Sequence, residues 1–398
     1  MLPVRYGGLG LRNSFRTAPA AYWASIADSL HPLSQRYPAI AEAMCDNLNN
    51  GAAGAAANLR EAVVAAQTLD HAGMIERPEW RALLGGARPP QPTAITRGEW
   101  VHGCQYYGSD ACEHLEFTNL LHALRGRSAA GPDPDPARLR SCRGPFAGEW
   151  LVTCPTSQQL EISNADLMAA LRLRLGLPTN VDPRDPFGYR RLADGSGLRL
   201  HARHRGLVAA WRQVFLEAGG QVPRRNVERL LRNTHVMVPP GDQRRLDLVV
   251  PGLGVARGVP LFCDATCVTP VTMRGTARPG CLLRDGGALR QAQRANDRTY
   301  PEVAASQLGR LCCLSVEVFG RWGDDPVWLV PALAAERARE LPRRIRRGSE
   351  LALMRRWWGL LGIAVQRAVA RCVIEDAGVD LSVEALEAPP GIADLPVQ

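Results

Sequence analysis

Asp247 and Asp264 are the residues whose types and positions are best suited to chemistry, because each stands in an otherwise apolar stretch. Asp247 lies in residues 244–250 (RRLDLVV) and Asp264 lies in residues 260–268 (PLFCDATCV). A carboxylate is costly to bury unless it is paired or coordinates a metal. Two of them in neighbouring apolar segments therefore predict a site for a hard divalent cation.

The segments around these aspartates predict the elements that position them. Residues 246–250 and 259–268 flank a Pro/Gly-rich turn (PGLGVARG), a pattern typical of a hairpin of two buried strands. A helix over 202–219 and a short strand over 220–227 are expected before them. A Gly/Arg-rich loop, a helix over 288–300 and a β-branched run over 311–320 follow. This order predicts an α/β (α+β) core, with a small mixed sheet flanked by helices.

The rest of the chain divides by composition into four parts. Residues 1–90 are Ala-rich with helical spacing and predict a helical region. Pro and Gly cluster within 91–185, which is expected to be a linker with short helices. The α/β core occupies 186–345. Residues 346–398 are expected to form an amphipathic helix with Arg on one side, followed by a loose tail.

Charge and cysteine content narrow the class of protein. The 398 residues carry a net charge of +9, from 48 basic residues that are almost all Arg against 39 acidic ones. Arginine forks match phosphate oxygens, so nucleic acid is the expected partner, with a solvated basic surface as the alternative. Eleven cysteines without a C-x-x-C pair favour a reduced intracellular compartment. We see no signal peptide and no run long enough to span a membrane, and expect no membrane partner.

The order of residues from Asp247 through Asp264 to Tyr300 resembles the PD-(D/E)XK restriction-endonuclease-like fold. More specifically, it resembles the nuclease domain at the C-terminal end of site-specific non-LTR retrotransposon polyproteins. Residues 2–25, which begin LPVRYGGLGLRNSF, resemble the segment after the reverse transcriptase palm and thumb in related polyproteins. Residues 260–272, 320–323 (GRWG) and 355–361 (RRWWGLL) are similar to C-terminal pieces of the same proteins.

The resemblance implies a metal-dependent endonuclease that nicks DNA for target-primed reverse transcription. Asp247 and Asp264 would hold Mg²⁺ or Mn²⁺, and the carbonyl oxygen of Ala265 would be the third ligand. Such a cation polarises the phosphoryl oxygen and lowers the pKa of an attacking water. The implied partners are DNA and RNA, bound through the Arg-rich surface, and the implied location is intracellular and nuclear.

One departure from this family concerns the catalytic cation. The family places a Lys two residues after the second Asp, or moves it onto the next helix four residues before a Tyr. Here these positions hold Thr266 and Asn296, the latter counted from Tyr300. Arg294 and Arg298 lie on the same predicted helix and are candidates to reach the phosphate. Arginine can clamp an oxyanion, but it stays protonated and cannot act as a base.

Two other metal sites known from related proteins are not expected. The family often carries a Cys/His knuckle before the nuclease core, but residues 185–206 offer His201 and His204 without a Cys, so we predict no zinc and read these histidines as part of a basic patch. Reverse transcriptases carry an F/Y-x-D-D tetrapeptide, which this sequence lacks. The adjacent Asp324 and Asp325 are expected at a turn and helix start instead.

Three functions of different classes remain open from the sequence. The chain is an active nicking endonuclease, a decayed relative that binds nucleic acid without cleaving it, or a protein-interaction scaffold built on the Ala-rich helices. Asn296 bears on the choice between the active endonuclease and the decayed relative, because its uncharged amide stands where the family has a catalytic Lys.

Overall fold

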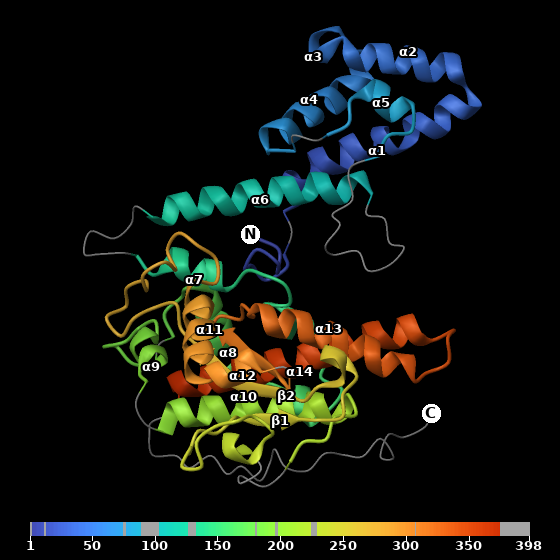
Figure 1. Ribbon diagram of the computed structural model, residues 1–398. Coiled ribbons are helices and arrows are strands. Elements are labelled where there is room, and N and C mark those ends of the chain that lie inside the picture. The colour runs from blue at the N-terminus through green and yellow to red at the C-terminus, as the bar shows by residue number, and fades with distance from the viewer. Residues whose placement is uncertain are drawn as a thin grey trace. The chain divides into compact units, whose positions relative to one another are not determined.

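The protein folds into two compact units, residues 1–123 and 124–398. The computed structural model describes residues 2–11, 13–74, 77–88, 103–125, 133–179, 181–195, 198–223, 229–306 and 308–374 (Figure 1). The loose tail predicted at the C-terminus lies outside these residues. Each unit has its own hydrophobic core.

The first unit is helical. Its core is formed by residues of α1, α2, α4 and α5, with Trp23, Leu30 and Leu69 fully buried. Asn13 caps α1, because its Oδ1 accepts a hydrogen bond from Phe15 N–H (3.0 Å). The helices are α1 (Ser14–Arg36), α2 (Pro38–Asn49), α3 (Gly51–Gly54), α4 (Ala57–His71), α5 (Trp80–Leu84) and α6 (Cys104–Arg125).

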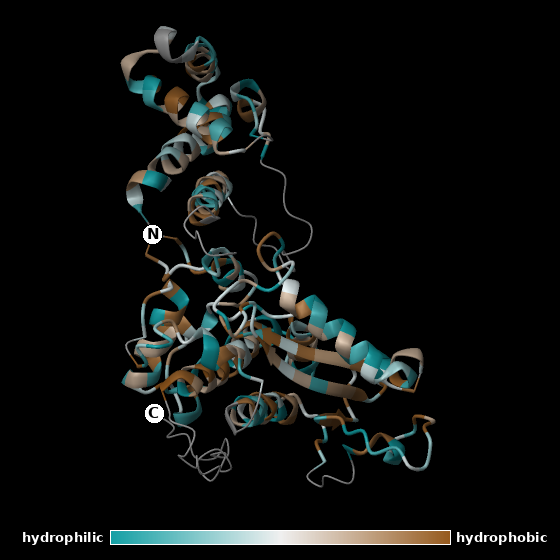
Figure 2. Ribbon diagram, turned by 90° about the vertical axis from the view of Figure 1, so that its left-hand side faces the viewer, coloured by the Kyte–Doolittle hydropathy of each residue, from teal (hydrophilic) through white to brown (hydrophobic). Residues whose placement is uncertain are grey.

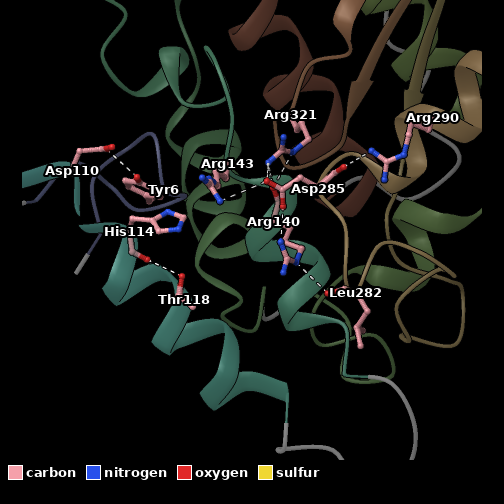
Figure 3. Close-up of polar contacts among 10 residues, drawn as sticks. All are labelled: Tyr6, Asp110, His114, Thr118, Arg140, Arg143, Leu282, Asp285, Arg290 and Arg321. Atoms are coloured by element: carbon pink, nitrogen blue, oxygen red, sulfur yellow. Dashed lines mark hydrogen bonds and ion pairs between the residues drawn. The ribbon is translucent and has the colours of Figure 1, made fainter. Parts of the chain in front are cut away.

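The N-terminal segment that carries the Gly-rich GGLGL sequence is held against α6. The Tyr6 hydroxyl donates to Asp110 Oδ1 at 2.9 Å (Figure 3). Arg5 pairs with the same carboxylate at 2.9 Å and also bonds to Glu113. Although burial opposes it, these two acids raise the pKa of Arg5. Two charged contacts thus fix the segment on one helix of this unit.

The second unit is α+β, as the sequence predicts. Its helices are α7 (Asp135–Ser141), α8 (Asn164–Leu175), α9 (Tyr189–Ala193), α10 (Leu198–Glu217), α11 (Gly287–Thr299), α12 (Pro301–Ala305), α13 (Asp324–Arg339) and α14 (Arg346–Ile374). Its strands are β1 (Leu248–Val250), β2 (Leu261–Val268) and β3 (Arg310–Glu317).

The strands form one mixed sheet in the order β1-β2-β3. β1 and β2 are antiparallel, which confirms the predicted hairpin, and β2 and β3 are parallel. The β2 to β3 connection contains α11 and α12, since parallel strands need a crossover. The short strand predicted over 220–227 does not form at residues 220–223, and residues 224–228 lie outside the described part.

Helices cover both faces of the sheet. Side chains alternate along β2, so Cys263 and Ala265 join the core shared with α10 and α14, whereas Phe262 joins the cluster that contains Tyr300 and Val303. Figure 2 shows the strands in mostly apolar colours, while the surrounding helices mix polar and apolar residues. Asp264, the neighbour of Cys263 and Ala265, therefore belongs to the α11–α12 side.

Helix α14 is a core element of this unit. Its Trp357 and Trp358 are fully buried and therefore make core contacts. In length and composition α14 resembles a membrane-spanning helix, but 72% of its most apolar window is buried in the unit. It packs against α10, α13 and α8.

An ion-pair network holds the start of α11. Arg140 and Arg321 bond to the Asp285 carboxylate at 2.7 and 3.0 Å, and Arg143 lies 3.7 Å from it (Figure 3). Burial alone would raise the pKa of Asp285, but the three guanidinium groups lower it. Asp285 precedes α11 by two residues, with Gly286 in the left-handed conformation that lets the chain turn (φ 66°). The network thus fixes the helix that covers Asp264.

Candidate active site

Asp247 and Asp264 lie where β1 and β2 pair. Leu248 is paired with Cys263, so continuing the antiparallel ladder by one residue brings Asp247 and Asp264 to neighbouring positions. The Asp247 N–H also donates to Cys263 O at 3.1 Å. This bond ties Asp247 to β2 at the start of β1.

Both carboxylate oxygens of Asp247 are held by protein donors. Oδ2 accepts from the Ala265 N–H at 2.7 Å, and Oδ1 accepts from His204 Nε2 at 3.0 Å. The side chain of Asp247 is 20% exposed and that of His204 is 37% exposed. The hydrogen bond to Asp247 raises the pKa of His204 against the effect of burial, and the Asp264 charge and the backbone of Ala265 add to the rise.

Asp264 carries a strongly perturbed carboxyl group. Burial raises the pKa of Asp264 to about 6, and the negative charge of Asp247 adds to this effect. His204 and the Tyr300 hydroxyl act in the opposite direction. Two carboxylates that repel each other in a partly buried setting favour the binding of a cation.

Tyr300 lies at the end of α11, beside Asp264. Its hydroxyl donates to Arg245 O at 2.6 Å. Burial raises the pKa of Tyr300, and the charges of Asp264 and Asp247 raise it further. The phenol is therefore neutral, and its hydrogen bond holds the end of α11 against the backbone of Arg245. The Tyr300 hydroxyl also interacts with the Asp264 side chain, which lowers the pKa of that carboxyl group.

Asn296, which stands where the family has its helix-borne Lys, is buried. It is only 4% exposed, and neither its Oδ1 nor its Nδ2 has a hydrogen-bond partner of normal geometry in the described part of the chain. Its amide faces Cys313, which is paired with Asp264 across β2 and β3. An amide at this position brings no charge to the aspartates.

The structure does not bring Arg294 and Arg298 into this group. Both side chains are exposed on α11, on the opposite side from Asn296, and the Arg298 Nε–H donates to Arg294 O at 3.1 Å. That one of them reaches the phosphate of a substrate stays a prediction. Four-residue spacing places the two arginines on one face of a helix, and that face points to solvent.

His204 is the site residue that sequence reasoning missed. It was assigned to a solvated basic patch because no Cys accompanies it. Helical spacing carries a signal for it, since His204 is three residues before Leu207 and seven before Trp211, both fully buried on α10. His204 therefore lies on the same buried face of α10 as Leu207 and Trp211, at the end of the helix that contacts Asp247.

The donor set fits Mg²⁺ or Mn²⁺. No group of three or more His, Cys, Asp or Glu side chains in the described residues is arranged to hold a metal ion. Mg²⁺ needs fewer protein ligands, because it binds through one or two carboxylates and keeps several waters. Asp247, Asp264 and the carbonyl oxygen of Ala265 supply such oxygen donors.

Comparison with known proteins adds no family assignment. No family model matches the chain, and no curated protein matches it.

The perturbed carboxyl group of Asp264 predicts a pH-dependent cost in stability. In the unfolded chain the group ionises near 3.8, whereas in the fold it keeps its proton up to about pH 6. Stability is therefore lost as the pH rises through this interval, because the folded state binds more protons than the unfolded one. In EDTA at about pH 8, Asp264→Asn should raise the free energy of unfolding by about 1–3 kcal/mol. Urea unfolding measures this, and an equal gain at about pH 4 would contradict it.

Proposed function

We propose that the second unit is a retrotransposon-derived, metal-dependent DNA endonuclease of the restriction-endonuclease-like class, which nicks target DNA by phosphodiester hydrolysis. Asp247, Asp264 and the Ala265 carbonyl oxygen hold the Mg²⁺ or Mn²⁺ ion. A bound cation would supply the polarisation of the phosphoryl oxygen and the activation of water. Tyr300 closes the site on the α11 side.

The observation that carries this proposal is the electrostatic interaction between Asp264 and Asp247. Their strands are neighbours in the sheet, and burial together with the Asp247 charge raises the pKa of Asp264 to about 6. Perturbed carboxyl groups with a specific charged neighbour are enriched at functional sites. A structural carboxylate at this depth would be expected to pair with Arg, as Asp285 does.

The substrate would lie along the exposed face of α11. Arg290, Arg294 and Arg298 are spaced four residues apart and are all exposed. In the described part of the chain none of the three forms an ion pair, whereas on α13 Arg339 pairs with Glu336 at 2.8 Å. Like charges at this spacing destabilise a helix, so the stripe is explained by an anionic partner. The phosphate backbone of DNA, or of RNA, provides a regular row of negative charges.

Removing two arginines of this stripe should reduce the salt dependence of DNA binding. For Arg294→Ala with Arg298→Ala, we expect the slope of log K against log salt to fall by about 2, since each phosphate contact contributes about 0.9. Fluorescence anisotropy with labelled duplex DNA measures the slope. Arg337→Ala with Arg339→Ala is the matched control, because those side chains pair with Glu340 and Glu336. Equal slopes for both double variants would refute the assignment of this face.

Nicking of supercoiled plasmid tests the function directly. The full chain is incubated with plasmid in Mg²⁺, in Mn²⁺ and in excess EDTA. The proposal expects open circles in either metal and none in EDTA. Intact plasmid in both metals, from protein that binds DNA, would reject cleavage.

Asn296 favours a second candidate, a relative that binds nucleic acid without cutting it. The buried amide supplies no charge where the family has Lys, and its contact is with the Cys313 thiol. DNA retention together with intact plasmid would support this candidate.

A further inference from the structure

His204 reaches the aspartates from an element outside the hairpin that carries them. It lies on α10, whose Leu207, Trp211 and Val214 are buried in the core under the sheet. Since these contacts fix the helix, the backbone of His204 is placed by the core rather than by the site. His201, one turn earlier, is exposed.

The contact between His204 and Asp247 has a defined direction. Nε2 of His204 lies 3.0 Å from Oδ1, and a carboxylate only accepts, so the imidazole donates. Oδ2 accepts from the Ala265 N–H at 2.7 Å. In the described residues these are the two partners of the Asp247 side chain, one from α10 and one from β2. Together they hold the plane of the carboxylate, which a single donor would leave free to rotate.

Asp247 directly precedes β1, and its N–H and C=O are bonded to Cys263 O (3.1 Å) and to the Arg229 side chain (3.1 Å), so its backbone is fixed and the orientation of its carboxylate depends on side-chain partners. Ligating carboxylates depend on hydrogen-bonding partners behind them, whose loss typically weakens metal affinity by about 10- to 100-fold. His204 is placed to be such a partner, and the basic-patch interpretation gives it no such role.

We propose that His204 is a positioning residue of the cation site, which donates a hydrogen bond to Asp247 and thereby sets how tightly the site holds its divalent cation. This inference rests on the proposed function only in that Asp247 and Asp264 bind the cation. It does not require cleavage.

The test is a titration of the full chain with Mn²⁺, followed by the loss of the free-ion electron paramagnetic resonance signal. His204→Ala removes the donor, whereas His204→Gln keeps an N–H at a similar reach. We expect about 10- to 100-fold weaker Mn²⁺ binding for His204→Ala and recovery of most of the affinity for His204→Gln. His201→Gln is the matched control and should bind as the wild type does. Thermal unfolding in EDTA checks that each variant is folded.

The outcomes separate this inference from the nuclease proposal. Unchanged Mn²⁺ binding in folded His204→Ala overturns it, and so does an equal loss in His204→Ala and His204→Gln, since that result makes the imidazole a direct ligand. The inference is also overturned if the wild-type protein and Asp264→Asn bind Mn²⁺ equally, because Asp264 then does not hold the cation. Recovery by His204→Gln in a protein that leaves plasmid intact supports the positioning role while rejecting cleavage.

Discussion

Asp264→Asn is expected to lower the rate of plasmid nicking by about 10³-fold, while DNA binding stays within about twofold of the wild type. In the proposed site, the loss of one of the two anionic ligands would weaken the binding of the cation and its effect on the phosphoryl group, a contribution of several kcal/mol. About 4 kcal/mol corresponds to about 10³ in rate. Asn retains the size of Asp, so the packing of β2 against α11 is kept.

The matched control for this variant is Asp297→Asn. Asp297 is exposed on α11 and accepts a hydrogen bond from Gln293 at 3.0 Å. The Asp297→Asn substitution changes the net charge by the same amount as Asp264→Asn but does not alter Asp247 or Asp264, so nicking should be retained. Single-turnover rates with Mg²⁺ give the comparison. Nicking that persists in Asp264→Asn would remove this carboxylate from the mechanism.

Asn296→Lys is expected to raise the rate of nicking, by about 10²-fold if the missing charge limits the reaction. A positioned cation that stabilises developing negative charge typically contributes about 10²- to 10³-fold. Asn296 is buried, faces Cys313 and lies on the helix that covers Asp264. A Lys there would pair with a carboxylate group that has no Arg or Lys partner in the described residues.

Asn296→Met separates charge from packing in this experiment. Methionine is close to Lys in length but carries no charge, so it should leave the rate unchanged or lower it. The two variants are compared at equal protein concentration after thermal unfolding has shown that both are folded. A rate for Asn296→Lys no higher than that for Asn296→Met would mean that this position does not limit the reaction.

The hairpin and the helix before β3 were predictable from sequence because their signals are local. Apolar runs on both sides of PGLGVARG predict β1 and β2, and residues 288–300 predict α11, but the sequence did not show which of Asn296, Arg294 and Arg298 faces the core. The strand expected over 220–227 was not found at residues 220–223, where Gly220 lies against Val250. Short apolar segments with Gly and Pro carry too little periodicity to settle such a case.

The site was predictable only in part, because its contacts join distant parts of the chain. The aspartates stood out by their apolar neighbours, whereas His204 lies 43 residues before Asp247 and looked like one more basic residue. The same holds for Arg140 and Arg321, which fix Asp285 ahead of α11 from 145 and 36 residues away. Contacts between residues so far apart in the sequence depend on how the sheet and its helices pack, and a local sequence pattern does not predict that packing.

The central claim is that Asp247 and Asp264 converge on one divalent cation. A crystal of the full chain soaked in MnCl₂ tests it most directly, through the anomalous difference map at the manganese edge. We expect a peak within bonding distance of one oxygen of each carboxylate and of the Ala265 carbonyl oxygen. A well-ordered site without that peak, or with manganese bound only elsewhere, would contradict it.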